Sequence, residues 1–274
     1  MAAGRPMISE SDLKLSASLE KIKHVIIVMS GKGGVGKSTV SSNLAMSIAM
    51  KGYKTGIMDV DIHGPNIPKM FGLEDAQLAV EEDKLMPVEA AHGLKVMSMA
   101  FLLPEKDAPV AWRGPVKMGA IRQFIEDVAW GDIDYLIIDM PPGTGDEAIS
   151  IIQLIPKADG MVVVTTPQDV ALMDSRKSIV FSVQVKIPII GIVENMSSFV
   201  CPHCGERSDI FKAGGGERTA KDMGVQFLGR VPIEPGIVIS GDSGVPIVAA
   251  APDSVSAKAF AKIASKVLKT VGRP

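Results

Sequence analysis

The segment that most constrains the fold lies near the amino end, where a glycine-rich stretch joins two patterned runs. The apolar run Val25–Met29 has the composition of a buried strand, and the repeat that follows, with Val40 and Leu44 on one side, predicts a helix. Between them stands the sequence Gly31-Lys32-Gly33-Gly34-Val35-Gly36-Lys37-Ser38-Thr39. Glycines at this spacing are typical of a phosphate-binding loop, because backbone N–H groups can curl around phosphate oxygens without Cβ clashes.

Two side chains of this loop have predicted roles in binding a nucleotide. Lys37 is expected to pair with the β- and γ-phosphates, and the Ser38 hydroxyl is expected to ligate Mg²⁺. The following helix presents the positive end of its dipole to the phosphates. A glycine-rich turn without a ligand is the alternative, but the flanking strand and helix are the context that the phosphate-binding pattern requires. We therefore expect the chain to bind MgATP through residues 31–39 and to hydrolyse it.

Further apolar runs alternate with helical stretches along the chain. They are Thr55–Met58, Leu94–Met97, Tyr135–Ile138, Gly160–Thr165 and Ile187–Val193. Several are apolar throughout, as expected for strands that are buried on both faces of a parallel sheet, and the intervening segments are long enough for crossover helices. The sequence predicts an α/β fold with a doubly wound, mainly parallel sheet and helices on both faces.

The domain organisation follows from the same pattern. We expect one P-loop NTPase domain over residues 21–274, preceded by a polar tail or short helix over residues 1–20. The stretches Gly214–Gly216 and Pro232–Pro246, rich in glycine or in proline and glycine, are predicted to be loops within the domain.

Composition excludes several classes of function. The chain has 274 residues and a formal net charge of −2, so no strong basic field is available for a nucleic-acid partner. No apolar run approaches the roughly 20 residues that span a bilayer, and residues 1–20 do not resemble a secretory signal. Two cysteines are too few for a disulfide framework. We expect a cytoplasmic protein.

Three aspartates follow predicted strands. Asp59 and Asp61 come after Thr55–Met58, and Asp139 ends the run at residue 138. Because the carboxyl ends of parallel strands face the ligand crevice, Asp139 is expected to hold Mg²⁺, usually through water. Capping or turn formation is the alternative for each aspartate, and the sequence alone does not rank Asp59 and Asp61. In the loop after Asp139, Gly143 could bring a backbone N–H close to the γ-phosphate.

The two cysteines lie close together in Cys201-Pro202-His203-Cys204-Gly205. Two intervening residues let both thiolates face one ion, although a redox pair or two buried thiols are alternatives. A tetrahedral site needs four ligands, and His203 inside the turn is poorly placed to supply one. A second copy of the chain is the economical source of the missing pair. Coordination chemistry alone does not choose between zinc and an iron–sulfur cluster.

The additional lysine of the glycine-rich loop, Lys32, gives that loop a resemblance to the deviant Walker A motif of the SIMIBI-class ATPases, which include the MinD and ParA partitioning ATPases. The resemblance implies that Lys32 reaches across a dimer to the partner's nucleotide. It also implies that Asp61 orients the attacking water and that Asp59 lies near the magnesium. By the same resemblance, Asn195 bonds the adenine edge and the loop at Pro232 packs against the base.

The combination of motifs resembles the Mrp/ApbC family in particular. The resemblance rests on the deviant Walker A loop, on Asp59-Val60-Asp61-Ile62-His63-Gly64-Pro65-Asn66, on Asp139-Met140-Pro141-Pro142-Gly143-Thr144-Gly145-Asp146, and on Asn195-Met196-Ser197 followed by the cysteine pair. It runs from about Lys23 to about Lys269. It implies an ATP-dependent homodimer that carries a [4Fe–4S] cluster at its interface and delivers it to apo-proteins.

Two rival functions remain at the level of the sequence. Near the carboxyl end, an apolar helical face that includes Phe260 and Val267 stands opposite a row of lysines, which suits a membrane-associated partitioning ATPase. A last helix packed on the sheet gives the same pattern, so the sequence does not favour a membrane partner. The second rival is a zinc-stabilised ATPase whose metal never moves.

Overall fold

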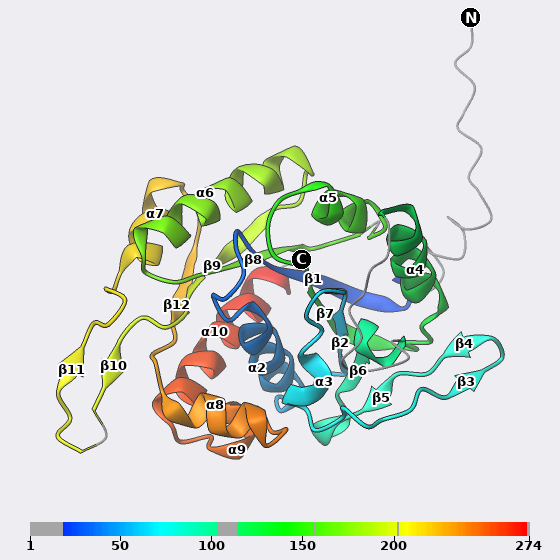
Figure 1. The fold of residues 1–274 in the computed structure, drawn as a ribbon, viewed down its shortest axis with the longest axis horizontal. Helices are drawn as coiled ribbons and strands as arrows, with labels where there is room; N and C mark the ends of the chain where they lie inside the picture. Colours follow the sequence, from blue (N-terminus) through cyan, green and yellow to red (C-terminus); the bar gives the residue numbers. More distant parts are fainter. Residues whose placement is uncertain (1–18, 103–113, 156, 202, 273–274) are drawn as a thin grey trace, which may run out of the picture.

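The computed structural model describes residues 19–102, 114–155, 157–201 and 203–272. The predicted tail, apart from Leu19 and Glu20, lies outside the described residues. Within them, a sheet of eight strands runs through the molecule in the order β12-β9-β8-β1-β7-β2-β6-β5 (Figure 1). All neighbours pair in parallel except β5, which runs antiparallel to β6.

Every predicted run overlaps a strand of this sheet, although Leu94, Ile187 and Pro188 lie just before their strands. The bounds of the strands are β1 Ile22–Ser30, β2 Thr55–Asp59, β5 Val88–Glu89, β6 Lys95–Ser98, β7 Ile133–Asp139, β8 Gly160–Thr165, β9 Ile189–Glu194 and β12 Phe227–Arg230. Two small hairpins stand outside the sheet, formed by β3 Val80–Glu81 with β4 Lys84–Leu85 and by β10 Phe199–Val200 with β11 Arg207–Ser208. The mainly parallel α/β sheet confirms the predicted fold class.

Helices cover both faces of the sheet (Figure 1). One face carries α4 Gly114–Asp127, α5 Asp146–Gln153, α6 Asp169–Gln184 and α7 Gly215–Asp222. The other carries α2 Lys37–Ala49, α3 Ile67–Met70, α8 Pro235–Asp242, α9 Ile247–Ala250 and α10 Val255–Val271. Short 3₁₀ turns occupy Ala91–Gly93 and Met99–Leu102.

The central strand β1 explains why the runs are apolar throughout. Ile27 and Met29 belong to the core under α4 and α5, whereas Ile26 and Val28 belong to the core under α2 and α10. All four side chains are completely buried. A strand between two helical layers must be apolar on both faces, because side chains alternate between them.

The expectation of loops at Gly214–Gly216 and Pro232–Pro246 is wrong. The first stretch starts α7: Gly214 precedes the helix with φ at +78°, and a Cβ on Gly215 would lie 2.5 Å from Leu172 Cδ1. The second contains α8, which begins at Pro235. Proline is tolerated at the first helical position because its missing N–H has no partner there, so proline and glycine mark helix starts in these stretches.

The apolar face of α10 is buried in the protein. Phe260, Ile263 and Val267 are at most 1% exposed, and the helix packs on α2 and β12. Its lysines at positions 258, 262, 266 and 269 are exposed. Packing on the domain therefore explains the amphipathic pattern. None of the helices in the described residues combines the length and the apolarity needed to cross a membrane.

Candidate nucleotide site and cysteine hairpin

The glycine-rich loop connects β1 to α2 in the predicted strand–loop–helix setting. Gly34 and Gly36 both have φ at +80°, a left-handed conformation that residues with a Cβ rarely adopt. A cavity of about 470 Å³ opens over this loop. Its lining includes loop residues 33, 34 and 36–39 together with Asp61, His63, Pro141, Pro142 and Glu147. The cavity thus lies where the segments after β2 and β7 meet the loop, at the carboxyl ends of the strands.

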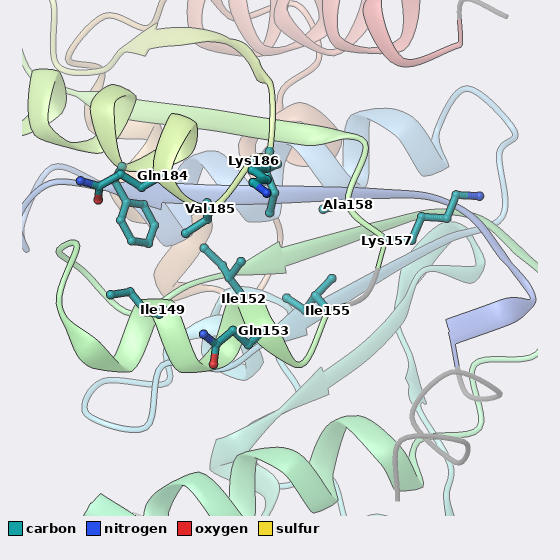
Figure 2. A pocket seen from close by; sticks show the side chains of 11 residues that line it. Ile149, Ile152, Gln153, Ile155, Lys157, Ala158, Gln184, Val185 and Lys186 are labelled. Atoms are coloured by element: carbon teal, nitrogen blue, oxygen red, sulfur yellow. The ribbon is translucent and has the colours of Figure 1, made fainter. Parts of the chain in front are cut away.

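A larger hollow of about 710 Å³ lies elsewhere, between the ends of α5 and α6 (Figure 2). Ile149, Ile152 and Val185 contribute apolar surface, and Lys157 and Lys186 are also part of its lining. The residues that line it do not include the glycine-rich loop or the three aspartates, as far as the structure describes them. Cavity volume alone therefore does not identify the nucleotide site. The smaller cavity is the one that is lined by the glycine-rich loop and Asp61.

Asp139 is the electrostatic centre of the smaller site. Its carboxylate is fully buried, and Oδ2 accepts hydrogen bonds from Lys37 Nζ and Ser38 Oγ, both at 2.7 Å. Oδ1 accepts from Ser41 Oγ at 2.5 Å. A carboxylate needs such partners when it is buried, since an unpaired buried charge is strongly destabilising. The neighbouring hydroxyl and carboxylate oxygens are hard donors of the kind that Mg²⁺ prefers.

Asp59 and Asp61 have different surroundings in the structure. Asp59 is fully buried and accepts hydrogen bonds from the Asp61 N–H at 3.1 Å and from Ser98 Oγ at 2.9 Å. Burial, with repulsion from Asp139 as the next cause, raises the pKa of Asp59 to about 8. Asp61 is 8% exposed and lines the cavity, and burial also raises its pKa. Of the two, Asp61 is the carboxyl group that a bound phosphate would meet first.

Two other predicted loop groups do not line the cavity in the described residues. The Gly143 N–H donates to the Ser30 carbonyl at 2.8 Å, so this bond must break before the N–H can reach a phosphate. Lys32 is half-buried, and its carbonyl accepts a hydrogen bond from Ser30 Oγ.

Asn195 contacts the glycine-rich loop outside the lining of the cavity. The Asn195 side chain is 4% exposed, and its Nδ2 donates to the Val35 carbonyl at 2.9 Å. A Cβ on Gly36 would overlap that amide nitrogen. Val231, just before Pro232, donates its N–H to the carbonyl of Glu194. The structure therefore places Asn195 against the loop, and it places the residue before Pro232 next to the strand end that precedes Asn195.

The two cysteines lie at the tip of the β10–β11 hairpin, which extends from the edge of the molecule (Figure 1). Cys201 is half-buried, Cys204 is exposed, and both are free thiols. The Cys201 carbonyl accepts from the Gly205 N–H at 2.9 Å, which closes the turn. Hydrogen bonds from the Cys204 backbone, and then from His203, lower the pKa of the Cys201 thiol. Pro202 lies outside the described residues.

Sequence reasoning missed several contributors to the nucleotide site. Ser41 carries a partial signal, because it stands four residues after Lys37 on the same side of α2. At the rim of the cavity, Lys117 Nζ lies 2.7 Å from His63 Nε2 and 2.5 Å from Glu147 Oε1. Lys117 comes from α4, and nothing in its local sequence indicates a role at a site formed by distant segments.

Comparison with known proteins agrees with this geometry. A ParA family model described as an NUBPL iron-transfer P-loop NTPase matches residues 21–268. The chain belongs to this family. The match covers the nucleotide site and the cysteine hairpin together.

Two relatives and one solved structure are similar over most of their length. An iron–sulfur cluster carrier protein from Saccharolobus solfataricus is 52% identical over 260 residues, which cover 95% of this chain and 88% of the relative. An iron–sulfur cluster carrier protein from Methanocaldococcus jannaschii is 48% identical over 267 residues, which cover 97% of this chain and 91% of the relative. A nucleotide-binding protein from Archaeoglobus fulgidus, solved with ADP, has a TM-score of 0.76 and 42% identity, covering 86% of this chain and 92% of that one.

Proposed function

We propose that this protein is an ATP-hydrolysing iron–sulfur cluster carrier, which holds a [4Fe–4S] cluster between two copies of the chain and transfers it to apo-proteins. The observation that carries the proposal is the pair of free thiols at an exposed hairpin tip, Cys201 and Cys204, in a chain that also contains a nucleotide site. The names of the relatives from Saccharolobus and Methanocaldococcus support it. The cytoplasm suits the proposal, because thiols stay reduced there.

The ligand count supports a shared cluster. Among the described residues, no group of three or more histidine, cysteine or acidic side chains could hold a metal ion. Two thiolates from each of two chains give the four ligands that a [4Fe–4S] cluster takes. The lowered pKa of Cys201 favours the thiolate form that binds iron. An exposed position also suits cargo that must leave.

In the nucleotide site, the chain's own residues bind and orient the substrate. Lys37 would move its ammonium from Asp139 to the β- and γ-phosphates. Ser38 and Asp139 would hold Mg²⁺, and Asp59 would lie near it. Bound Mg²⁺ neutralises charge on the transferring phosphoryl group. Asp61 orients the attacking water from the cavity wall, and the Gly143 N–H turns from Ser30 towards the γ-phosphate. Asn195 and the loop at Pro232 contact the adenine.

Lys32 acts on the other subunit's nucleotide in this proposal. The side chain belongs to the glycine-rich loop but stays out of the loop's own cavity as described. A lysine ammonium supplied across a dimer would stabilise transition-state charge in the way that an arginine finger does. ATP hydrolysis would then require the same dimer that completes the cluster site.

The test is transfer of a cluster after anaerobic reconstitution with iron and sulfide. The wild-type protein is expected to hold iron and sulfide and to activate an apo-ferredoxin. Cys201→Ala and Cys204→Ala should each lose the cluster while still binding MgATP, and His203→Ala, in the same turn, is the matched control that should keep it. Zinc at one ion per two chains, with no capacity to hold iron and sulfide, would contradict the carrier function and favour the zinc-stabilised ATPase.

A further inference from the structure

A buried carboxylate outside the nucleotide site lies at the end of β9. Glu194 ends β9 and is fully buried. Its Oε1 accepts hydrogen bonds from Ser197 Oγ at 2.5 Å and from the Gly214 N–H at 2.9 Å. Its Oε2 accepts from the Gly216 N–H at 2.5 Å. A buried carboxylate with three donors is a well-satisfied acceptor, which implies that its neighbours are held firmly.

These donors lie at the two ends of the segment that carries the cysteines. Ser197 precedes β10, and Gly214 and Gly216 follow β11 at the start of α7. The segment 198–213 includes Cys201 and Cys204. Its two ends therefore both lie next to the Glu194 carboxylate. The β10–β11 hairpin extends outward from the edge of the molecule (Figure 1).

The glycine run fits this role. A Cβ on Gly216 would lie 3.0 Å from Glu194 Cβ and 3.1 Å from Oε2, so a side chain at this position would crowd the carboxylate and require it to shift. Arg230 Nε lies 3.5 Å from Glu194 Oε1, and its guanidinium also pairs with Glu217 on α7. The same carboxylate thus closes the hairpin base and fixes the first turn of α7.

Glu194 is also next to the nucleotide site along the chain. The following residue, Asn195, contacts the glycine-rich loop through the Val35 carbonyl. The Asn195 N–H donates to Thr165 of β8, and the Glu194 carbonyl accepts from Val231. Consecutive residues at one strand end therefore contact the nucleotide loop and the cysteine segment.

We infer that Glu194 is a positioning residue that couples nucleotide binding to the cysteine hairpin, by holding both ends of residues 198–213 at the strand end that contacts the glycine-rich loop. This inference rests on the proposed function, in which Asn195 contacts the adenine and the thiols bind a cluster. When a nucleotide engages Asn195, the strand end is held in place, and the carboxylate passes this restraint to the hairpin. The hairpin and its thiols become less mobile.

The test measures the coupling as a change in the reactivity of a cysteine thiol, so it does not require a bound cluster. The rate of Cys204 alkylation by iodoacetamide is measured on the full chain, at a concentration where it is monomeric, with and without MgADP. For the wild type, MgADP is expected to slow alkylation by about 5-fold, the lower end of ordinary site-to-site coupling. In Glu194→Gln, the amide cannot accept at every position, so the slowing should fall to less than about 2-fold although MgADP still binds.

Glu217→Gln is the matched control, because it makes the same chemical change on α7 and touches the same Arg230 but leaves the hairpin base intact. It should keep the wild-type ratio. Ser197→Ala removes one donor at one end only and should give an intermediate ratio, which covers the case that Glu194→Gln does not fold. A wild-type ratio in Glu194→Gln with MgADP bound, or no effect of MgADP on the wild type, would overturn the inference. Failure to hold a cluster would contradict only the proposed function.

Discussion

The nucleotide site and the cysteine hairpin of this chain differ in how buried their functional side chains are and in whether those side chains already have partners. In the nucleotide site, Lys37 is 6% exposed and Asp139 is fully buried, and each charge already has a partner. At the hairpin tip, Cys204 is exposed and the described residues offer no third metal ligand. The first site is assembled by one chain before its ligand arrives. In the function proposed above, the second is half of a site that another copy of the chain completes.

The strands that carry the two sites also differ. The nucleotide site rests on the carboxyl ends of β1, β2 and β7 at the centre of the sheet, where β1 and β2 each pair with β7 over five or six residues. The hairpin consists of two strands of two residues each and is held at its base by Glu194. We therefore expect substitutions in the first site to act on binding and stability, and substitutions in the second to act on assembly.

The largest expected effect is that of Lys37→Ala. Loss of the ammonium removes the main charge partner of the triphosphate, so ATP affinity should fall by about 100-fold or more in calorimetry. Lys32→Ala is the control within the same loop and should keep the affinity of the monomer. Equal affinities for Lys37→Ala and the wild type would show that the nucleotide binds elsewhere.

A smaller effect is expected from mixing two inactive variants. Lys32→Ala lacks the residue proposed to act across the dimer, and Asp61→Ala lacks the residue proposed to orient water. In a mixed dimer, one of the two sites has both residues, so ATPase activity should recover to roughly a quarter of the wild-type rate under statistical mixing, given the two-fold symmetry of the dimer. Mixed dimers that form, as shown by tagged capture, but remain inactive would place Lys32 in its own subunit's site.

The smallest expected effect is on stability and its dependence on pH. Because the pKa of Asp59 is raised from 3.8 to about 8, the folded state keeps a proton that the unfolded state loses, and stability should fall as pH rises through that interval. Asp59→Asn imitates the protonated form. In Mg²⁺-free buffer at pH 7.5, it should add on the order of 2 kcal/mol, or roughly 5 °C in Tm, and much less at pH 5.

The control for this comparison is Asp253→Asn, which alters a fully exposed carboxylate and should leave Tm unchanged at both pH values. A decrease in Tm for Asp59→Asn at pH 7.5 would mean that the negative charge of Asp59 is favourable in the nucleotide-free protein.

The sequence predicts most of the fold because the central strands are apolar on both faces. Val25–Met29 and Gly160–Thr165 are visible as strands for that reason, and the glycine-rich loop has strong local constraints. The edge strand β12 and the helix α8 are not visible in the same way. Phe227–Arg230 is short and contains a glycine, and the proline that begins α8 has the same composition signal as a loop.

The site residues that sequence analysis missed depend on tertiary proximity. Ser98 meets Asp59 across neighbouring strands, and Lys117 meets His63 from a helix 54 residues away. Glu194 has the local pattern of a polar strand end, whereas the hydrogen-bond donors to its carboxylate come from residues 197–216 and an ion-pair partner is Arg230. Such contacts follow from the register of the sheet, which no local pattern specifies.

The most direct test of the two-chain cluster site is native mass spectrometry of the anaerobically reconstituted protein. The account predicts a species with the mass of two chains plus one [4Fe–4S] cluster, and its loss in Cys204→Ala, which should still bind nucleotide. A single chain that carries a complete cluster, or a pair of chains that holds only one zinc ion, would contradict it.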